Sequence, residues 1–551
     1  MVKAKIISSL EKCFYETKIN SLKEIKHISA LKNERLNIQL AYTESDCLAP
    51  QRIWVNAVVT GELAKFSTIR TVEMVPVNLP TNNCCNDTNY IGTEPGLYPD
   101  ILQDLCKSGR ISVVAGQVHS LWIEFDFSCG VPSGEYSIKI SLLSASSNET
   151  ITENTVNIKI INAQLPKQDI YLTQWFHCDC LSDYYNVPVF SVRHWEIIEN
   201  FLRTAVRNGI NTILTPVFTP PLDTEPLCER KTVQLVDVTV DNGVYSFGFE
   251  KLEKWIKICD KCGVEHFEIS HFFTQWGAAH APKIMALKNG EYTRIFGWET
   301  DATGEEYKVF LREFLRAFLA FMKTNNNDKR CIFHISDEPN ISHLEQYKAA
   351  RSIVEDLLSD YMIVDALSNF AFYQSGAVKY PVCSNNHIEP FIENAVPDLW
   401  TYYCCSQHTD VSNRFIAMPS ARNRIIGAQM YKYNIKGFLQ WGYNFYYNQY
   451  SRDLINPYTN TCGDYFVPSG DTFSVYPGYD GKAVESLRIA VFYEALQDMR
   501  AMRLCEGLCG KDAVISALES VCGEIKFNRS NMTGPQIIEM REKINSLIEN
   551  A

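Results

Sequence analysis

The sequence has no excess of basic residues and no long apolar run. Its 551 residues carry a formal net charge of −12, with no cluster of Lys and Arg, which argues against a nucleic-acid partner because such proteins usually present a basic face. No apolar stretch approaches the roughly 20 residues that a membrane helix needs. The apolar piece within Met1–Leu10 is too short for a secretory signal. We therefore expect no membrane partner and a cytoplasmic location, although a signal that had been removed would leave no trace.

Several familiar catalytic motifs are also absent. The chain contains no G-x-S-x-G elbow, no P-loop, no H-E-x-x-H pair and no strand-to-helix G-x-G-x-x-G. Cys259 and Cys262 have zinc-like spacing but no second ligand pair nearby. The histidines near predicted strand ends follow no standard ligand pattern; they are His177, His271, His280 and His334. The sequence therefore predicts no metal site and no cofactor.

Cysteine, by contrast, is abundant. The 19 cysteines are scattered and odd in number, and they include two adjacent pairs, Cys84-Cys85 and Cys404-Cys405. Secreted disulfide frameworks are usually short chains with an even count. We therefore expect reduced thiols, which agrees with a cytoplasmic setting.

The first part of the chain has the pattern of a β-rich domain. The stretch before Asn33 looks helical or irregular, and Tyr90–Asp100 reads as a long Gly/Pro-rich loop. Between residues 36 and 164, short alternating or β-branched runs are separated by turn residues and not by helices. These runs are Gln51–Thr60, Ile69–Leu79, His119–Ser128, Glu135–Leu143 and Thr155–Ile161. Repeated short strands of this kind predict a β-sandwich.

After a linker at Leu165–Gln168 the pattern changes to alternating strands and helices. The predicted strands are Ile170–Trp175, Ile210–Phe218, Val264–Phe273, Cys331–Ser336, Tyr361–Ala366, Pro381–Ser384, Leu399–Cys404 and Gly437–Tyr443. The predicted helices between them include Val192–Asn208, Phe249–Cys262, Glu305–Lys323, Leu344–Leu358 and Ala421–Tyr433. Eight strands with crossover helices predict a (β/α)₈ TIM barrel. Within it, Asp241-Asn242-Gly243 predicts a hairpin across Gln234–Phe247.

The fold class expected from these patterns is multidomain α/β plus β. We expect an N-terminal β-sandwich domain at 1–165, a barrel catalytic domain at 169–500 and a helical C-terminal extension at 501–551.

The fourth predicted strand ends in two adjacent carboxylates and a proline, Asp337-Glu338-Pro339. Pro339 cannot donate to a strand ladder, so pairing should stop there. The pattern Ser342-His343-Leu344-Glu345 then predicts a capping box at the start of a helix. In a barrel this layout places Asp337 and Glu338 at the carboxyl-terminal mouth, where barrel enzymes carry their chemistry. Acidic residues before a helix also occur simply because they face solvent or favour a helix N-terminus.

Aromatic and hydrogen-bonding side chains recur after the other predicted strands. Aromatic rings cover the apolar faces of a sugar, while amide, carboxylate and hydroxyl groups bind its hydroxyls. Packing in the barrel core would explain many of the same aromatic residues. The expected substrate-binding residues are Trp175, His177, Trp276, His334, Asn369, Tyr373, Tyr402, Trp441, Asp471 and Tyr476. This set predicts a glycan or glycoconjugate substrate.

These segments resemble glycoside hydrolase family 123. The resemblance lies in His334–Pro339, Trp400–Cys405, Gly437–Trp441, Gly470-Asp471 and Val475–Gly478, and in Gly96–Asp100 and Leu121–Ile123 of the first domain. It implies an exo-acting β-N-acetylgalactosaminidase that retains anomeric configuration through substrate assistance. In that scheme the 2-acetamido oxygen of the sugar attacks the anomeric carbon and forms an oxazolinium intermediate. Glu338 would be the general acid and base, and Asp337 would orient the acetamido group.

The implied arrangement presents a geometric difficulty, because consecutive strand residues point to opposite faces. Asp337 and Glu338 can share a pocket only if the chain bends at Asp337. Two close carboxylates would then resist joint ionisation, which raises the pKa of one of them.

Other assignments remain open at this stage. The scaffold could act on β-GlcNAc or on a non-acetamido sugar, with Asp471 or Glu389 as a separate nucleophile, or it could be a non-catalytic carbohydrate-binding protein. The sequence predicts neither the natural glycan nor the oligomeric state.

Overall fold

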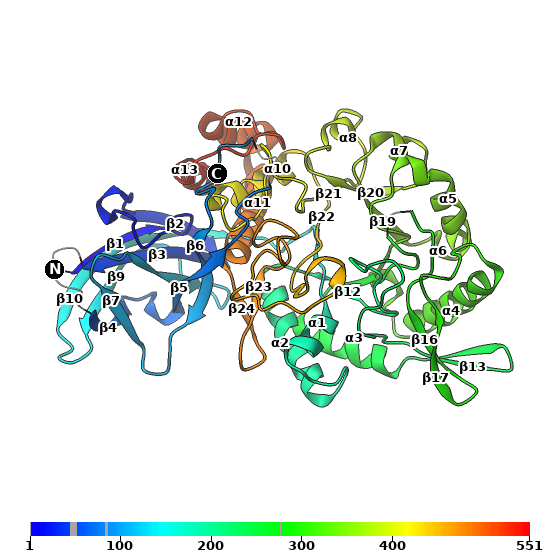
Figure 1. Cartoon of the computed structure of the whole chain (residues 1–551). Coiled ribbons are helices and arrows are strands. Elements are labelled where there is room, and N and C mark those ends of the chain that lie inside the picture. The colour runs from blue at the N-terminus through cyan, green and yellow to red at the C-terminus, as the bar shows by residue number, and fades with distance from the viewer. Residues whose placement is uncertain (1, 45–51, 83–85, 276) are drawn as a thin grey trace.

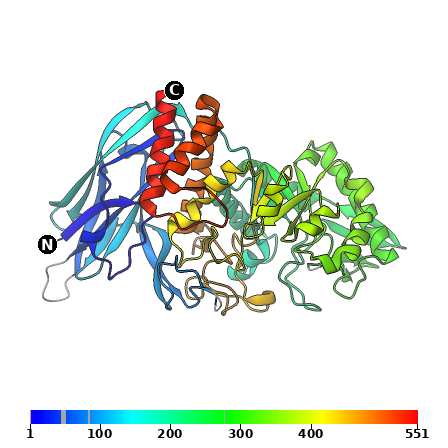
Figure 2. The same ribbon diagram turned by 90° about the horizontal axis from the view of Figure 1, so that it is seen from above.

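The computed structural model describes residues 2–44, 52–82, 86–275 and 277–551. The protein has an N-terminal region of two β-sheets, a closed barrel of eight parallel strands and a group of C-terminal helices (Figure 1). Seen from above, the C-terminal helices lie between the N-terminal sheets and the barrel (Figure 2). Within the described residues, no helix is both long and apolar enough to cross a membrane.

The two N-terminal sheets each have five strands and enclose one hydrophobic core. Their orders are β1-β3-β8-β5-β6 and β2-β10-β9-β4-β7. Ile38 and Ile123 of the first sheet belong to the same buried cluster as Val55 and Ile140 of the second. The strands are β1 (Val2–Ser8), β2 (His27–Lys32), β3 (Arg35–Glu44), β4 (Arg52–Thr60), β5 (Ser67–Val77), β6 (Gly96–Asp104), β7 (Arg110–Val114), β8 (His119–Asp126), β9 (Gly134–Ser144) and β10 (Thr150–Gln164).

Two local predictions for this region are wrong in part. Residues 9–26 are irregular apart from a 3₁₀ turn, but two strands flank them: β1 pairs antiparallel with β3 along its whole length, and β2 pairs parallel with β10. The expected loop Tyr90–Asp100 becomes strand β6 from Gly96 onward. Pro99 is tolerated there because β6 is the edge strand of its sheet and Pro99 lies where the register with β5 shifts.

The barrel has a strand in each of the eight predicted places. The strands are β11 (Tyr171–Gln174), β12 (Thr212–Thr215), β15 (His266–Ile269), β18 (Cys331–Phe333), β19 (Met362–Leu367), β20 (Tyr380–Ser384), β21 (Trp400–Tyr402) and β22 (Gly437–Gln440). At their amino-terminal ends Trp400 stacks on Tyr171 with ring centroids 5.2 Å apart. A Cβ on Gly437 would meet the Trp400 ring at 2.0 Å, so only glycine fits there. Aromatic packing therefore fills this end of the barrel.

Helices connect successive barrel strands. They are α1 (Cys178–Tyr184), α2 (Val192–Arg207), α3 (Glu250–Cys262), α4 (Glu305–Thr324), α5 (Leu344–Ser352), α6 (Glu355–Leu358), α7 (Phe370–Gln374), α8 (Glu389–Glu393), α9 (Ser420–Arg424) and α10 (Ile426–Lys432). The predicted helix at Leu344–Leu358 is divided into α5 and α6. The expected capping box at Ser342 is wrong, because the capping side chain is Asn340, which accepts a hydrogen bond from the Ser342 N–H at 2.9 Å and begins a 3₁₀ turn, η4 (Ile341–His343).

A small sheet decorates the second and third βα connections. The predicted hairpin is present as β13 (Asp237–Asp241) and β14 (Val244–Gly248), with Asn242 and Gly243 both at positive φ, as a type I′ turn requires. The sequence did not predict its partners β16 (Ile284–Lys288) and β17 (Glu291–Phe296). The other short elements are β23 (Val475–Pro477), β24 (Ala483–Glu485), η1 (Ile19–Ser21), η2 (Ala64–Phe66), η3 (Asp328–Arg330) and η5 (Gln449–Ser451).

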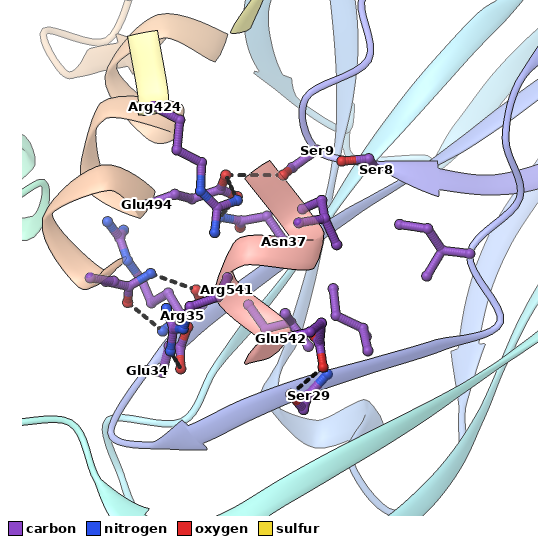
Figure 3. A pocket seen from close by; sticks show the side chains of 15 residues that line it. Ser8, Ser9, Ser29, Glu34, Arg35, Asn37, Arg424, Glu494, Arg541 and Glu542 are labelled. Atoms are coloured by element: carbon purple, nitrogen blue, oxygen red, sulfur yellow. Dashed lines mark hydrogen bonds and ion pairs between the residues drawn. The ribbon is translucent and has the colours of Figure 1, made fainter. Parts of the chain in front are cut away.

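The C-terminal helices are α11 (Leu487–Cys509), α12 (Lys511–Cys522) and α13 (Gly534–Asn550). The expected boundary at 500/501 falls inside α11. Buried charges join these helices to the N-terminal sheets (Figure 3). Arg424 bonds Glu494 at 2.6 Å and Asp498 at 2.7 Å, and Arg541 bonds Asp498 at 3.0 Å and Glu34 at 2.8 Å. We call these five residues the charged junction; they fix the sheets to the helical side of the barrel.

Candidate active site

A cavity of about 210 Å³ lies at the carboxyl ends of the barrel strands. Six of the twelve predicted site residues line it; they are Trp175, His177, Asp337, Glu338, Tyr402 and Trp441. They follow or end the first, fourth, seventh and eighth strands, so the closed barrel brings together residues that are up to 266 positions apart. The remaining wall is largely aromatic and polar, as a sugar site requires.

The two predicted catalytic carboxylates share this cavity because the chain turns sharply at the second of them. Strand β18 ends at Phe333, and Glu338 adopts a left-handed conformation with φ of 44°. Both Asp337 and Glu338 therefore line the same wall, Asp337 partly buried and Glu338 exposed. A non-glycine residue in this region of φ costs about 1–3 kcal/mol and persists where the surrounding structure imposes it. The expected bend is present one residue later than predicted, at Glu338 and not Asp337.

Asp365 holds the segment that leads into the turn. This fully buried carboxylate, in β19, accepts hydrogen bonds from the backbone N–H groups of Ile335 at 3.1 Å and Ser336 at 3.3 Å. It also accepts one from the Tyr347 hydroxyl of α5. Asp365 therefore replaces the ladder bonds that are lost where β18 ends, and it fixes the path of the chain directly before Asp337.

His334 lies beneath the catalytic pair and not in the cavity wall. Its Nε2 bonds Glu268 at 2.7 Å, and its Nδ1 lies 3.4 Å from Asp365. Burial alone would lower the pKa of His334, but its interactions with Asp365 and Glu268 outweigh burial and raise the pKa to about 10. His334 is therefore an imidazolium between two carboxylates under the floor of the site.

Burial, followed by the neighbouring Glu338 carboxylate, raises the pKa of Asp337 well above its ordinary value; the His334 imidazolium opposes this shift. Asp337 therefore retains its proton at a pH where an isolated aspartic acid would be ionised. Tyr402 fixes one of the acidic oxygens by donating a hydrogen bond of 2.7 Å to Oε1 of Glu338.

The two tryptophans of the cavity are each held by a buried carboxylate. Trp175 donates from Nε1 to Glu268 at 2.8 Å, and Trp441 donates from Nε1 to Asp471 at 2.9 Å. Asp471 is fully buried behind Trp441, and burial raises its pKa to about 6. These contacts fix the orientation of both indoles, which leaves their ring surfaces to form the cavity.

His177 lines the cavity with both ring nitrogens already engaged. Nε2 lies 2.8 Å from the Trp441 carbonyl, and Nδ1 lies 3.3 Å from Nη2 of Arg230, which is paired with Asp179. Burial, followed by the Arg230 charge, lowers the pKa of His177 to about 4. The ring is therefore neutral, with Nε2–H donating to the carbonyl and Nδ1 accepting from Arg230.

The other predicted residues are not among those that line the cavity. Asn369 caps α7 by accepting from the Phe372 N–H at 3.2 Å, and Tyr373 of the same helix packs against Phe391. Tyr476 is buried and donates to Asp100 at 2.6 Å. Trp276 lies outside the described residues. Across the described ranges, no group of three or more His, Cys, Asp or Glu side chains is arranged to hold a metal ion.

Several polar residues that build the site were not among the predicted site residues. Asp223 and Gln275 line the cavity, while Glu268 and Asp365 support it from below. The only signal for Gln275 in the sequence is its position two residues after the third predicted strand, Val264–Phe273. Cys404 and Cys405 also line the cavity; the sequence showed them as an adjacent pair within the family-like segment Trp400–Cys405, but they were not among the predicted site residues.

A family model described as the glycoside hydrolase 123 catalytic domain matches residues 175–505, which is more than half of the chain.

The chain belongs to glycoside hydrolase family 123.

It is an enzyme that acts on glycosides. Its fold is similar to the solved structure of a family 123 glycoside hydrolase from Clostridium perfringens, described in connection with glycolipid glycan hydrolysis. That likeness has a TM-score of 0.76 at 14% sequence identity and covers 100% of this chain and 98% of the other.

More distant likenesses are weak. A putative beta-galactosidase from Bacteroides fragilis has a TM-score of 0.30 at 9% identity, covering 84% of this chain and 58% of that one. A family 5 mannosidase from Rhizomucor miehei has a TM-score of 0.32 at 11% identity, covering 61% of this chain and 94% of that one. No curated protein sequence matches the chain significantly. The family 123 assignment therefore rests on the family model, and the Clostridium structure supports the fold.

Proposed function

We propose that the protein is a retaining, exo-acting β-N-acetylgalactosaminidase that uses substrate-assisted catalysis. In this proposal the closed barrel and its helices form a (β/α)₈ TIM barrel. Enzymes with this fold carry out their chemistry at the carboxyl ends of the strands. The two N-terminal sheets form a β-sandwich domain at residues 1–165. The catalytic domain is at 169–500, and the helical C-terminal extension is at 501–551. The observation that carries the proposal is the turn at Glu338, which presents two adjacent carboxylates to one small cavity.

Adjacent carboxylates suit a substrate that supplies its own nucleophile. Glu338 protonates the glycosidic oxygen while the 2-acetamido oxygen attacks the anomeric carbon, and the bond to the leaving group breaks. Asp337 accepts a hydrogen bond from the acetamido N–H, and its negative charge stabilises the positive charge of the resulting oxazolinium. Glu338 then takes a proton from water, which opens the oxazolinium with overall retention.

The protonation states required by this scheme follow from binding. The acetamido N–H donates a stronger hydrogen bond to an ionised carboxylate than to a neutral carboxyl, so a bound substrate favours ionised Asp337. The proton that Asp337 gives up passes to the adjacent Glu338, which needs it for the first step. Tyr402 occupies Oε1 of Glu338, so Oε2 is the oxygen that carries the proton.

The cavity size supports exo action on one terminal sugar. Its volume of about 210 Å³ is below the range of about 300–1,000 Å³ that sites for drug-sized ligands occupy. Trp441 and Trp175 offer ring surfaces for the sugar. The separate nucleophiles considered from the sequence have little support, because Asp471 is buried behind Trp441 and Glu389, at the start of α8, does not line the cavity.

The test is turnover of aryl β-N-acetylgalactosaminide and β-N-acetylglucosaminide by purified enzyme. We expect the galacto substrate to be cleaved faster, and Glu338→Gln and Asp337→Asn each to lower kcat/KM by at least ~10²-fold. Glu345→Gln is the matched control, since this exposed carboxylate lies in α5 just beyond the site. Near-normal turnover in either catalytic variant would remove that residue from its role.

A thiazoline analogue of the oxazolinium intermediate separates this mechanism from one with an enzymatic nucleophile. Only an acetamido-dependent enzyme should bind it much more tightly than it binds the free sugar. Weak binding of the analogue together with rapid cleavage of a glycoside that lacks the acetamido group would overturn the mechanism.

A further inference from the structure

Two polar residues in the cavity wall lie outside the catalytic machinery described above. Asp223 is in the loop after β12, and Gln275 is in the loop after β15. Both face the cavity that contains Asp337 and Glu338.

Gln275 carries an unused donor. Its Oε1 accepts a hydrogen bond from the Asp223 N–H at 2.8 Å, and this bond settles which end of the amide is oxygen. Its Nε2 has no hydrogen-bond partner among the described residues, although the side chain is only 5% exposed. A buried donor without a partner costs about 1–3 kcal/mol. Such a group in a cavity wall is explained if a ligand supplies the acceptor.

Asp223 supplies an acceptor beside that donor. Its backbone is in the left-handed region with φ of 40°. Its Oδ2 accepts from the Tyr450 N–H at 3.0 Å, and its carbonyl accepts from the Ser451 hydroxyl at 2.7 Å. The loop after the eighth strand therefore fixes Asp223 in place. A carboxylate offers about four lone-pair directions, so capacity for a ligand donor remains.

The chemistry of this pair selects the group it binds. An ammonium group cannot accept from Gln275, and a carboxylate cannot donate to Asp223. A hydroxyl does both at once. Because the catalytic carboxylates take the substituents at C1 and C2 of the sugar, the hydroxyl in question belongs to C3, C4 or C6.

We propose that Asp223 and Gln275 together bind one hydroxyl of the terminal sugar and thereby determine which sugar the enzyme accepts. This inference rests on the proposed function. A site built around a hydroxyl rejects an analogue that lacks it far more strongly than an apolar pocket rejects a small change, because its own buried polar groups are then left unpaired.

The experiment compares kcat/KM for the aryl glycoside that the enzyme cleaves with its 3-, 4- and 6-deoxy analogues. In the natural enzyme, one analogue should lose on the order of 10²-fold or more. In Gln275→Leu and in Asp223→Asn the parent substrate should slow, and the loss for that one analogue should shrink to a few-fold. Gln275→Glu repeats the test in a variant that keeps the acceptor for the Asp223 N–H.

Gln449→Leu is the matched control, because it removes a second amide from the same cavity wall. It should leave the pattern of deoxy losses as it is in the natural enzyme. Unchanged losses in all three Asp223 and Gln275 variants would overturn the inference. So would recovery of an inactive Asp223→Asn enzyme by azide with formation of a glycosyl azide, since that result makes Asp223 the nucleophile.

If the proposed function is wrong, the results differ from those that would overturn the role of Asp223 and Gln275. If the enzyme cleaves only glycosides without an acetamido group, the thiazoline analogue fails to bind, yet the deoxy series made on the accepted sugar still tests Asp223 and Gln275.

Discussion

The Tyr402 hydroxyl donates a hydrogen bond of 2.7 Å to Oε1 of Glu338, which joins the seventh barrel strand to the turn after the fourth. Tyr402 is buried, while Glu338 is exposed to the cavity. The bond therefore fixes an acidic side chain that would otherwise move freely in an open site.

Tyr402→Phe should lower kcat/KM about 10- to 100-fold, because hydrogen bonds to charged groups contribute about 1.5–3 kcal/mol. The control is Tyr403→Phe, whose hydroxyl lies 3.4 Å from Asn423 and away from the cavity. Steady-state kinetics on an aryl glycoside measure the effect. Equal losses of kcat/KM in the two variants would show that the Tyr402 hydroxyl makes no specific contribution to catalysis.

His334 should make stability depend on pH in the alkaline range. Its pKa is raised from the ordinary 6.5 to about 10 in the folded protein. The stabilisation is therefore complete below about pH 6.5 and is lost as the pH rises toward 10, because in this range the folded state holds a proton that the unfolded state has released. Urea unfolding between pH 6 and 10 should show a decline that His334→Gln lacks. His27→Gln, at an exposed position in β2, should behave like the natural protein.

Arg424→Met should destabilise the protein by about 3–5 kcal/mol, because it leaves the buried carboxylates of Glu494 and Asp498 without one of their partners. Chemical denaturation at pH 7 measures the change. Lys257→Met breaks an exposed pair with Glu253 on α3 and should have little effect. Turnover by the folded Arg424→Met enzyme at 25 °C should remain, because the charged junction lies outside the cavity. An unchanged free energy of unfolding in Arg424→Met would show that the charged junction is not required for stability.

Cys404 and Cys405 should make the enzyme sensitive to trivalent arsenicals. Both line the cavity, and contact with the Cys405 thiol, followed by burial, raises the pKa of Cys404. Phenylarsine oxide condenses with two thiols and releases water, so it should inhibit at low molar excess, and a dithiol should restore activity. Cys405→Ser should lose this sensitivity relative to its own untreated rate. Cys228→Ser, at an exposed position, should keep it. Equal sensitivity of the natural enzyme, Cys405→Ser and Cys228→Ser would show that inhibition does not depend on the Cys404-Cys405 pair.

The barrel was predictable from sequence because each of its strands is a short apolar run followed by turn or polar residues. Asp337 and Glu338 were found for the same reason: two carboxylates before a proline, at a strand end, are conspicuous. Strands β1 and β2 were missed because their identity depends on distant partners, β3 and β10, and not on a strong local pattern.

The supporting residues of the site were hidden for a related reason. Glu268 accepts hydrogen bonds from Thr173 and Trp175, more than 90 positions earlier in the chain, and nothing local marks it as different from a surface glutamate. Asp223 lies in a long connection whose course only the folded chain defines. Tyr476 shows the converse, because it follows the pattern of a sugar contact but is hydrogen-bonded to Asp100 in the N-terminal sheets.

Helix α11 packs against the barrel helices α9 and α10, and it contributes Glu494 and Asp498 to the charged junction. A fragment cut at residue 169 would keep Glu494 and Asp498 but would lose Ser9, Glu34 and Asn37, which hydrogen-bond the same cluster. We therefore expect this fragment to be less stable than the whole chain, because its buried charges would lose hydrogen-bond partners that the N-terminal sheets supply.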